Sequence, residues 1–389
     1  MIDYKGELQK ALEGRKLHKV LLLPPDATRL HSFAGEITRA IMDMLPGCQF
    51  DIMPALGTHE PMSERECADF LGVPFDLILH HDWRNDIVKL GEVPAAFVTQ
   101  VSEGLMTEPI AVEVNKRLLD PSYDLIISIG QVVPHEVAGM ANYSKNIFVG
   151  CGGSNMINSS HMLGAFYGIE RILGRIDTPV RKVFDYAETH FITGLPLLYV
   201  LTVTQGSELC GIFTGRERGV FEQAAALSRE KNITMVDKPF QRCFVNLDER
   251  EFKSTWLGNK AVYRTRMAMA DGGELIILAP GVKRFGEDDE VDRLIRQYGY
   301  VGRERILELV KEHQDLRENL SAAAHLIHGS SDGRFKVTYA AKLLTREEIE
   351  GVGFGYMPYD EAVGLKDSGD MFIENPALGL WAAQSSYAP

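Results

Sequence analysis

Histidines, aspartates and an arginine stand at the ends of four apolar runs in the first 135 residues of this sequence. Each run is typical of a buried strand. In a parallel sheet the carboxyl ends of the strands share one edge, where ligands bind, so we expect these polar side chains to gather at one site. The runs cover 18–26, 48–59, 76–82 and 123–135, and the residues are Asp26 and Arg29, His59, His80, His81 and Asp82, and His135.

His59 and His135 are the strongest candidates for acid/base chemistry, because a histidine exchanges protons near neutral pH. Lys145 and His161 follow His135 along the chain. A lysine amine can form a covalent link to a cofactor, and a histidine ring can bind a metal. The glycine-dense stretch 148–155 leads into an expected helix from about residue 160, and it could bring backbone N–H groups to a phosphate without matching either common nucleotide-binding motif.

Other polar residues have structural as well as functional interpretations. Asp26 could cap a helix, whereas the planar guanidinium of Arg29 could anchor a carboxylate or a phosphate. The adjacent histidines of the third run would point to opposite faces of a strand, so they are not expected to share one metal ion. His325 and His328 have the spacing of a helical metal pair, but histidines near the carboxyl end of a helix also interact favourably with its dipole, and we favour this structural interpretation.

The composition favours a small-molecule partner in a reducing compartment. The 389 residues carry a formal net charge of −13, which argues against a nucleic-acid or anionic-membrane binder. The five cysteines are odd in number, far apart and without a CxxC pair, so neither a disulfide framework nor a cysteine-rich zinc site is indicated. No apolar run approaches the length of a membrane span, and we expect a cytoplasmic protein.

The alternation of apolar runs with amphipathic segments predicts two α/β domains with mainly parallel sheets. Helices are expected at 34–45 and 62–71. A second α/β pattern begins after the segment 238–247, with a helix expected at about 257–270. We place the domains at 1–235 and 236–389, with the last residues returning to cover the first domain. The active site is expected in the cleft between them.

The motifs together resemble the lactate racemase family that uses a nickel-pincer cofactor. The segments PPDATR, GTHEP, HDW and IGQVVPH, then Lys145 and His161, stand in the order and near the spacing of that family. The resemblance covers most of the first 165 residues. It implies an isomerase that inverts C2 of a 2-hydroxy carboxylate by reversible hydride transfer, with a nickel pyridinium-3,5-bisthiocarboxylate mononucleotide as its cofactor.

The resemblance also implies a role for each matching residue. His59 and His135 correspond to the two acid/base histidines, Lys145 to the lysine joined to the cofactor, and His161 to the nickel ligand. Asp26 and Arg29 match an Asp/Arg pair in the site, and Lys260 matches an anion-binding lysine of the second domain. The family implies a small 2-hydroxy acid and cofactor-synthesis proteins as partners, and no nucleic acid or membrane; the oligomeric state stays open.

Three departures from the family pattern widen the range of substrates and functions. The segment before Lys145 reads Met-Ala-Asn-Tyr-Ser where glycines are common, His59 is followed by glutamate instead of arginine, and Thr255-Trp256-Leu257 replaces a Tyr-Ser pair. A sugar acid of the gluconate type, epimerised at C2, therefore competes with lactate. A divalent-metal hydrolase or lyase and a non-catalytic cofactor carrier are further alternatives.

Overall fold

The computed structural model describes residues 2–366, 369–385 and 387, and the chain divides into two compact units. Unit 1 consists of Met1–Leu163 and Leu173–Asn232, and unit 2 of Gly164–Ile172 and Ile233–Pro389. The structure divides the chain after Asn232, whereas the sequence predicted a boundary after residue 235. The assignment of 164–172 to unit 2 has no counterpart in the sequence prediction. No helix among the described residues is long and apolar enough to span a bilayer.

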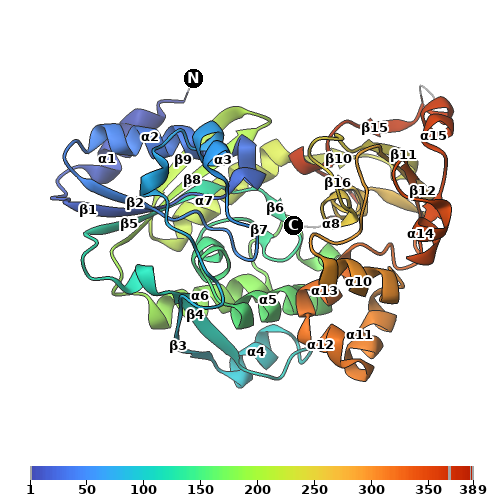
Figure 1. The fold of residues 1–389 in the computed structure, drawn as a ribbon, viewed down its shortest axis with the longest axis horizontal. Coiled ribbons are helices and arrows are strands. Elements are labelled where there is room, and N and C mark those ends of the chain that lie inside the picture. Colours follow the sequence, from blue (N-terminus) through green and yellow to red (C-terminus); the bar gives the residue numbers. More distant parts are fainter. Residues whose placement is uncertain (1, 367–368, 386, 388–389) are drawn as a thin grey trace. The chain divides into compact units, whose positions relative to one another are not determined.

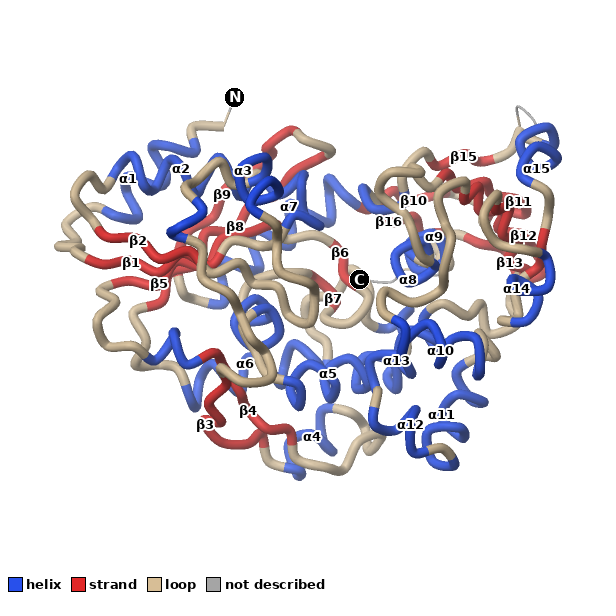
Figure 2. Tube along the Cα trace, viewed as in Figure 1, coloured by secondary structure: helices blue, strands red, loops and turns tan. Residues whose placement is uncertain are grey.

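Unit 1 is built on a five-stranded sheet in which four neighbouring strands run parallel and only the edge strand β9 is antiparallel. Its strands form the red band at the left of Figure 2. Leu, Ile and Val dominate β1 and β5 because both faces of a parallel sheet are covered. The predicted mainly parallel α/β fold is confirmed. The order is β2 (Gln49–Ile52), β1 (Lys19–Leu23), β5 (Leu125–Gln131), β8 (Leu197–Gln205) and β9 (Glu208–Gly215).

Helices α1 (Tyr4–Leu12) and α2 (Ala34–Met44) lie against this sheet (Figure 1). Leu8 of α1 and Ile41 of α2 share one apolar core with Leu22, Ile127 and Val200 of three neighbouring strands. Burying such side chains fully is worth about 1.5–3 kcal/mol each, so this core fixes the sheet from which the loops project. The helix expected at 34–45 is confirmed.

The helix expected at 62–71 is present as α3 (Glu64–Phe70), which starts at a capping box of Ser63 and Glu66. The strand expected at 76–82 is wrong. That segment holds a 3-10 helix, Phe75–Leu77, and a single bridge from Ile78 to Ile52, because Pro74 and the tight turn leave too few extended residues for a ladder. Its histidines therefore do not follow a strand of the main sheet.

The remaining elements of unit 1 surround the sheet. A hairpin of β3 and β4 is antiparallel, as is the two-residue pair of β6 and β7. The helix expected from about residue 160 begins earlier, at Ser154. These elements are β3 (Ile87–Val93), α4 (Ala95–Val101), β4 (Ile110–Asn115), β6 (Pro134–His135), β7 (Gly139–Met140), α5 (Ser154–Tyr167), α6 (Pro179–Phe191) and α7 (Arg218–Asn232), with the last residues of α5 belonging to unit 2.

Unit 2 contains a second five-stranded sheet, and all of its strands are parallel. Phe244, Ile276 and Ala340 from three of these strands pack with Ala362 in its core. The order is β14 (Gly355–Tyr356), β13 (Lys336–Ala341), β12 (Met269–Ala279), β11 (Phe240–Asn246) and β15 (Met371–Ile373).

Helices of unit 2 precede and separate these strands. The helix expected at 257–270 is two short helices, because the chain turns at Asn259. The last described strand, β16 (Leu380–Ala383), pairs with β10 (Ile233–Val236) inside unit 2, where the sequence predicted a return to the first domain. The helices are α8 (Thr255–Gly258), α9 (Lys260–Thr265), α10 (Asp289–Tyr298), α11 (Arg303–Glu312), α12 (Gln314–Glu318), α13 (Leu320–His328), α14 (Arg346–Gly351) and α15 (Tyr359–Leu365).

His81 has a structural role in unit 1. Its buried ring joins two segments: Nε2 lies 3.2 Å from the carbonyl oxygen of Gly152, and Nδ1 lies 3.0 Å from the amide nitrogen of Asn115. The carbonyl requires a donor at Nε2, so the ring is neutral and Nδ1 accepts from Asn115. Burial lowers the pKa of His81 from 6.5 to about 4. His81 thereby fixes the glycine-dense stretch next to β4.

Because only the neutral ring fits, His81 makes the stability of the fold depend on pH. Between pH 6.5 and 4 the His81 ring binds a proton in the unfolded chain but stays neutral in the folded chain. The folded state therefore loses stability as the pH falls through this range. The difference corresponds to about 3 kcal/mol at pH 4. In urea unfolding from pH 7 to 4, we expect His81→Asn to be less stable at pH 7 and to lose less stability on acidification.

The exposed neighbour His80 provides the control. His80→Asn should follow the wild-type pH curve. If the two substitutions give the same curve, the buried ring of His81 does not have this role.

Candidate active site

Asp26 joins two loops at the carboxyl edge of the first sheet. One of its oxygens, Oδ1, caps the 3-10 helix Ala27–Ser32 by accepting from the backbone N–H of Thr28 at 3.0 Å, and it also accepts from the Thr28 hydroxyl. The other, Oδ2, lies 2.5 Å from Nδ1 of His59. Asp26 is buried, whereas the His59 side chain is 42% exposed. The carboxylate therefore orients a histidine that solvent or a ligand can reach.

The loop after β2 brings His59 to this position. The backbone N–H of Ala55 donates to the carbonyl of Pro24 at 2.8 Å, and that of Gly57 donates to the carbonyl of Gly150 at 2.9 Å. Gly57 has a φ of 61°, which favours glycine. A Cβ on Gly150 would lie 2.7 Å from the Cβ of Ala55, so glycine is needed for this close approach. The three loops at the sheet edge are thus joined through their backbones.

The Asp26 carboxyl stays ionised in this environment. Burial alone would raise its pKa, but the hydrogen bond and charge of His59, the Thr28 hydroxyl and the charge of Arg29 outweigh burial, and the net pKa lies below 3.8. An ionised Asp26 accepts the proton of His59 Nδ1, so the neutral His59 ring carries its lone pair on Nε2. This is the arrangement of a histidine that is prepared to accept a proton.

His135 lies in β6 and is buried. Its Nδ1 accepts from the backbone N–H groups of Val137 at 3.1 Å and of Ala138 at 3.4 Å, so the neutral ring carries its proton on Nε2. Burial lowers the pKa of His135 well below 6.5, and the charges of Lys145 and Arg29 act in the same direction. His135 consequently presents a neutral N–H at Nε2.

Lys145 starts the π-helix Asn146–Gly150 next to the same strand ends. The amide of Asn146 donates to the carbonyl of Leu23 at 3.2 Å and to the hydroxyl of Ser128 at 2.9 Å, which fixes the lysine backbone beside β1 and β5. Burial, together with the charge of Arg29, lowers the pKa of Lys145 from 10.5 to about 8. A minority of the amine is therefore neutral and nucleophilic at neutral pH, a far larger share than for an ordinary lysine.

The loop before Lys145 adopts a backbone that usually requires glycine. Asn142 and Tyr143 have φ values of 61° and 57°, both in the left-handed region. Each such residue costs about 1–2 kcal/mol for a side chain other than glycine. The family pattern has glycines before the lysine, and here non-glycine residues take up a glycine-type conformation. Gly130, next to the amide of Asn142, leaves the space for it.

His161 is oriented by its own helix. Its Nδ1 lies 2.6 Å from the carbonyl oxygen of Ile157, one turn earlier in α5, so Nδ1 carries the proton and Nε2 the lone pair. Burial lowers the pKa of His161 from 6.5 to about 4, partly opposed by the hydrogen bond to Ile157. The ring is therefore neutral at physiological pH and suited to bind a metal through Nε2.

These side chains influence one another electrostatically within unit 1. The charges of Lys145 and Arg29 act on His135, and those of Lys145 and His59 act on His161. Coulomb interactions weaken with distance, so these side chains lie near one another. Six of the seven residues to which the resemblance gives roles act on one another in this way: Asp26, Arg29, His59, His135, Lys145 and His161.

The seventh residue, Lys260, belongs to unit 2, where it starts α9 with its Nζ 5.8 Å from the ring centre of Phe252. Its role stays a prediction. His325, also in unit 2, has both ring nitrogens engaged, by the Tyr263 hydroxyl at 2.7 Å and the Tyr300 hydroxyl at 2.8 Å. This is the structural role that we favoured. Among the described residues no group of three His, Cys, Asp or Glu side chains could hold a metal ion.

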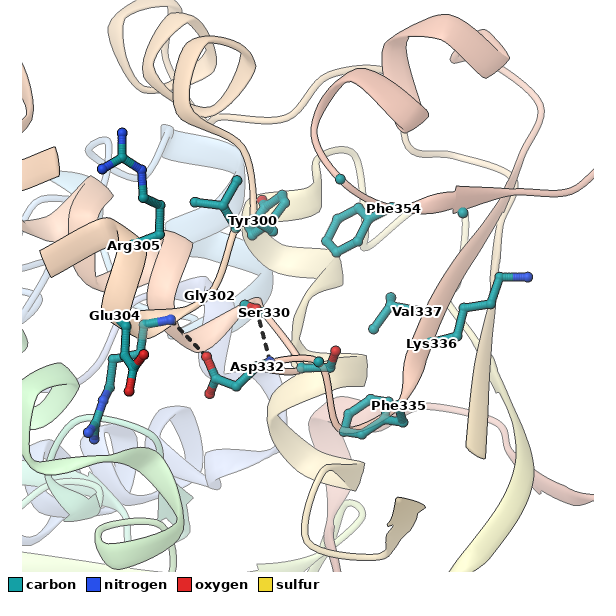
Figure 3. Close-up of a pocket in the computed structure, with 16 residues that line it drawn as sticks. Tyr300, Gly302, Glu304, Arg305, Ser330, Asp332, Phe335, Lys336, Val337 and Phe354 are labelled. Atoms are coloured by element: carbon teal, nitrogen blue, oxygen red, sulfur yellow. Dashed lines mark hydrogen bonds between the residues drawn. The ribbon is translucent and has the colours of Figure 1, made fainter. Parts of the chain in front are cut away.

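A cavity of about 920 Å³ in unit 2 is lined by none of the residues predicted from the sequence (Figure 3). It opens at the amino ends of β13 and β14, beside Phe354 and Lys336. Polar groups that line it bond to one another. The Asp332 carboxylate accepts from the backbone N–H of Arg303 at 2.8 Å, and the backbone N–H of Asp332 donates to the Ser330 hydroxyl at 3.0 Å. Ligands of parallel sheets bind at the opposite, carboxyl edge.

Sequence reasoning missed three residues that shape the site. Glu136 raises the pKa values of His135, Lys145 and His161 and so opposes the positive charge around it. Asn146 and Arg181 hold the lysine segment. The position of Glu136 next to His135 was a signal that could have been used, whereas nothing in the sequence connects Arg181 with a loop forty residues earlier.

Comparison with known proteins identifies relatives of this chain. The sequence profile described as the lactate racemase N-terminal domain matches residues 5–170. No curated protein matches the sequence.

Two solved structures are similar over nearly the whole chain. A protein from Thermotoga maritima has a TM-score of 0.87 at 26% identity, covering 98% of this chain and 97% of its own. The lactate racemase apoprotein from Thermoanaerobacterium thermosaccharolyticum has a TM-score of 0.73 at 17% identity, covering 96% of this chain and 88% of its own. At that identity the second likeness establishes the fold alone.

The pairing of Asp26 with His59 predicts a change in titration. In His59→Gln the charge of the histidine is lost while burial remains, so the pKa of Asp26 should rise above its wild-type value. NMR titration of the Asp26 carboxyl carbon measures this shift. Glu60→Gln, a substitution of the exposed neighbour, should leave Asp26 unchanged. An unaltered Asp26 titration in His59→Gln would mean that the two side chains are not paired.

Proposed function

We propose that this chain, whose residues 5–170 match the profile of the lactate racemase N-terminal domain, is an isomerase that inverts C2 of a 2-hydroxy carboxylate, either lactate or a larger acid. The observation that carries the proposal is the gathering of the Asp26–His59 pair, His135, Lys145 and His161 at one edge of the first sheet. Two histidines, one amine of lowered pKa and one oriented metal-binding nitrogen are the groups that such a reaction needs.

The side chains fit a nickel-pincer mononucleotide joined to Lys145. His161 has the tautomer of a metal ligand, with Nδ1 donating to Ile157 and the lone pair on Nε2. Lys145 has a pKa of about 8, so its amine can act as a nucleophile without strong base. Arg29, half-buried beside them, would hold an anionic group of the cofactor or substrate. When bound, the cofactor would supply a reversible acceptor for hydride from C2.

A hydride route explains why this protein needs only weak bases. The C2 proton of a 2-hydroxy carboxylate is very weakly acidic, and removing it next to a carboxylate would create a second negative charge. Removing the hydroxyl proton while hydride leaves C2 gives a neutral 2-keto group instead. His59 would take this proton at Nε2, because the ionised Asp26 holds Nδ1–H and stabilises the imidazolium that forms.

His135 would act on the same oxygen in a different way. Its Nδ1 is held by two backbone donors, so the ring offers a hydrogen bond from Nε2–H and does not readily take a proton. A neutral histidine of this kind polarises a carbonyl. The two histidines therefore differ in the resting protein, with His59 prepared to accept a proton and His135 prepared to donate a hydrogen bond. Rotation of the keto acid between them would present its other face for the return of hydride.

The proposal predicts a covalent adduct and bound nickel in protein made by a host that synthesises the cofactor. Intact mass and metal analysis should show the adduct in the wild type and its loss in Lys145→Ala. His161→Ala should keep the adduct and lose nickel. His59→Ala and His135→Ala should keep both while turnover falls by at least about 10²-fold, since each removes one acid/base group or donor.

Lys182→Ala, which removes a more exposed lysine of α6, is the matched control and should keep the adduct and full turnover. Protein from a host without the cofactor pathway sets the baseline mass. Stoichiometric zinc with no adduct in the cofactor-producing host would refute the proposal and favour a divalent-metal hydrolase or lyase. Full activity of His59→Ala or His135→Ala would refute that residue's role.

A further inference from the structure

Arg181 of α6 is fully buried and holds the loop that leads to Lys145. Its two Nη atoms make four hydrogen bonds to this loop. Nη2 donates to the carbonyl of Met140 at 2.7 Å and to that of Asn142 at 3.3 Å, and Nη1 donates to the Asn142 carbonyl at 3.3 Å and to the Ser144 hydroxyl at 2.9 Å. One guanidinium thus fixes three positions within five residues of the loop.

Further side chains hold Arg181 itself in place. Its guanidinium carbon lies 4.4 Å from the ring centre of Phe221, which stacks on Tyr143 at 5.1 Å. Asp185, one turn along α6, accepts from the guanidinium of Arg218 and interacts with the Ser144 hydroxyl. A planar fork of donors between an aromatic ring and a set of carbonyls is a geometry that arginine can satisfy and lysine cannot.

The loop needs such support because its backbone is unfavourable without glycine. Asn142 and Tyr143 are in the left-handed conformation directly before Ser144 and Lys145. Arg181 bonds to the carbonyl of the first of these residues and to the side chain that follows the second. Its positive charge also acts on the Lys145 amine and favours the neutral form. Arg181 can therefore influence Lys145 through the backbone and through charge.

We propose that Arg181 is the positioning residue for Lys145: by holding the loop 140–144, it presents the lysine amine in a fixed and reactive state. The relevance of this role to catalysis rests on the proposed function, since a lysine that is joined to a cofactor must be presented in one orientation. The positioning itself is a property of the folded chain alone.

Two substitutions separate the two effects of Arg181. Arg181→Met removes both the charge and the fork, whereas Arg181→Lys keeps the charge and loses the fork. Arg266→Lys is the matched control, because Arg266 is equally buried in unit 2 and binds the carbonyls of His328 and Ser330. Competitive acetylation with isotopic acetic anhydride measures how the reactivity of Lys145 depends on pH between 6 and 11. Peptide mass spectrometry quantifies the product, and exposed lysines of the same digest give the reference. Amide hydrogen exchange measures how readily the backbone of the loop 140–144 opens.

In Arg181→Met we expect the pH midpoint of Lys145 acetylation to move above that of the wild type and exchange in 140–145 to accelerate at least about tenfold. Arg181→Lys should restore the midpoint toward the wild-type value while exchange stays fast. Arg266→Lys should change neither reading. Circular dichroism shows whether each variant has folded. If Arg181→Met does not fold, the exchange rate of the loop in Arg181→Lys decides the test.

Wild-type acetylation and wild-type exchange in Arg181→Met would overturn the proposal. Faster exchange with the same acceleration across all of unit 1 would also overturn it, because that result describes general destabilisation. The test is independent of the proposed function. Protein without any adduct or nickel would refute the isomerase assignment while leaving the positioning of Lys145 by Arg181 intact.

Discussion

The site depends on burying basic side chains beside fixed positive charges. Burial is the largest cause of the lowered pKa values of His135, Lys145 and His161, and Arg29 or Lys145 adds to it in each case. Desolvation disfavours a charged group, and a nearby like charge disfavours it further. The sheet edge therefore holds two neutral imidazoles and an amine whose pKa is lowered to about 8. These are the states in which nitrogen atoms bind metals, attack carbon and donate hydrogen bonds.

Asp26 is the exception that makes the two candidate acid/base histidines different. It is buried like its neighbours, yet its pKa is lowered because His59 and Arg29 compensate for lost hydration. His59 thus has an anionic partner at Nδ1, and His135 has two backbone N–H donors at the same atom. Two residues of the same type are prepared for different tasks by what their second nitrogen contacts. The family resemblance alone would treat them as equivalent.

Residues that follow strand ends could be predicted from the sequence, because the parallel arrangement fixes where such loops meet. Asp26 and His59, from the loops after β1 and β2, are in contact as this reasoning predicted, and His135 follows β5. It failed for the segment 76–82, where an apolar run forms a 3-10 helix after Pro74 and one of its histidines, His81, serves the fold. The role of Arg181 could not be predicted, because nothing in the sequence of an amphipathic helix shows which carbonyls a buried arginine will bind. The tautomers of His135 and His161 could not be predicted for the same reason, since backbone hydrogen-bond partners determine them.

The central claim is that C2 is inverted by moving hydride and not by exchanging a proton. The most direct measurement is the fate of deuterium at C2 of a 2-hydroxy acid that the protein inverts in ordinary water, followed by NMR and mass spectrometry of the separated enantiomers or epimers. Hydride transfer to an enclosed acceptor predicts that the inverted product keeps its deuterium at C2. Complete replacement of deuterium by solvent hydrogen in the inverted product would contradict the account.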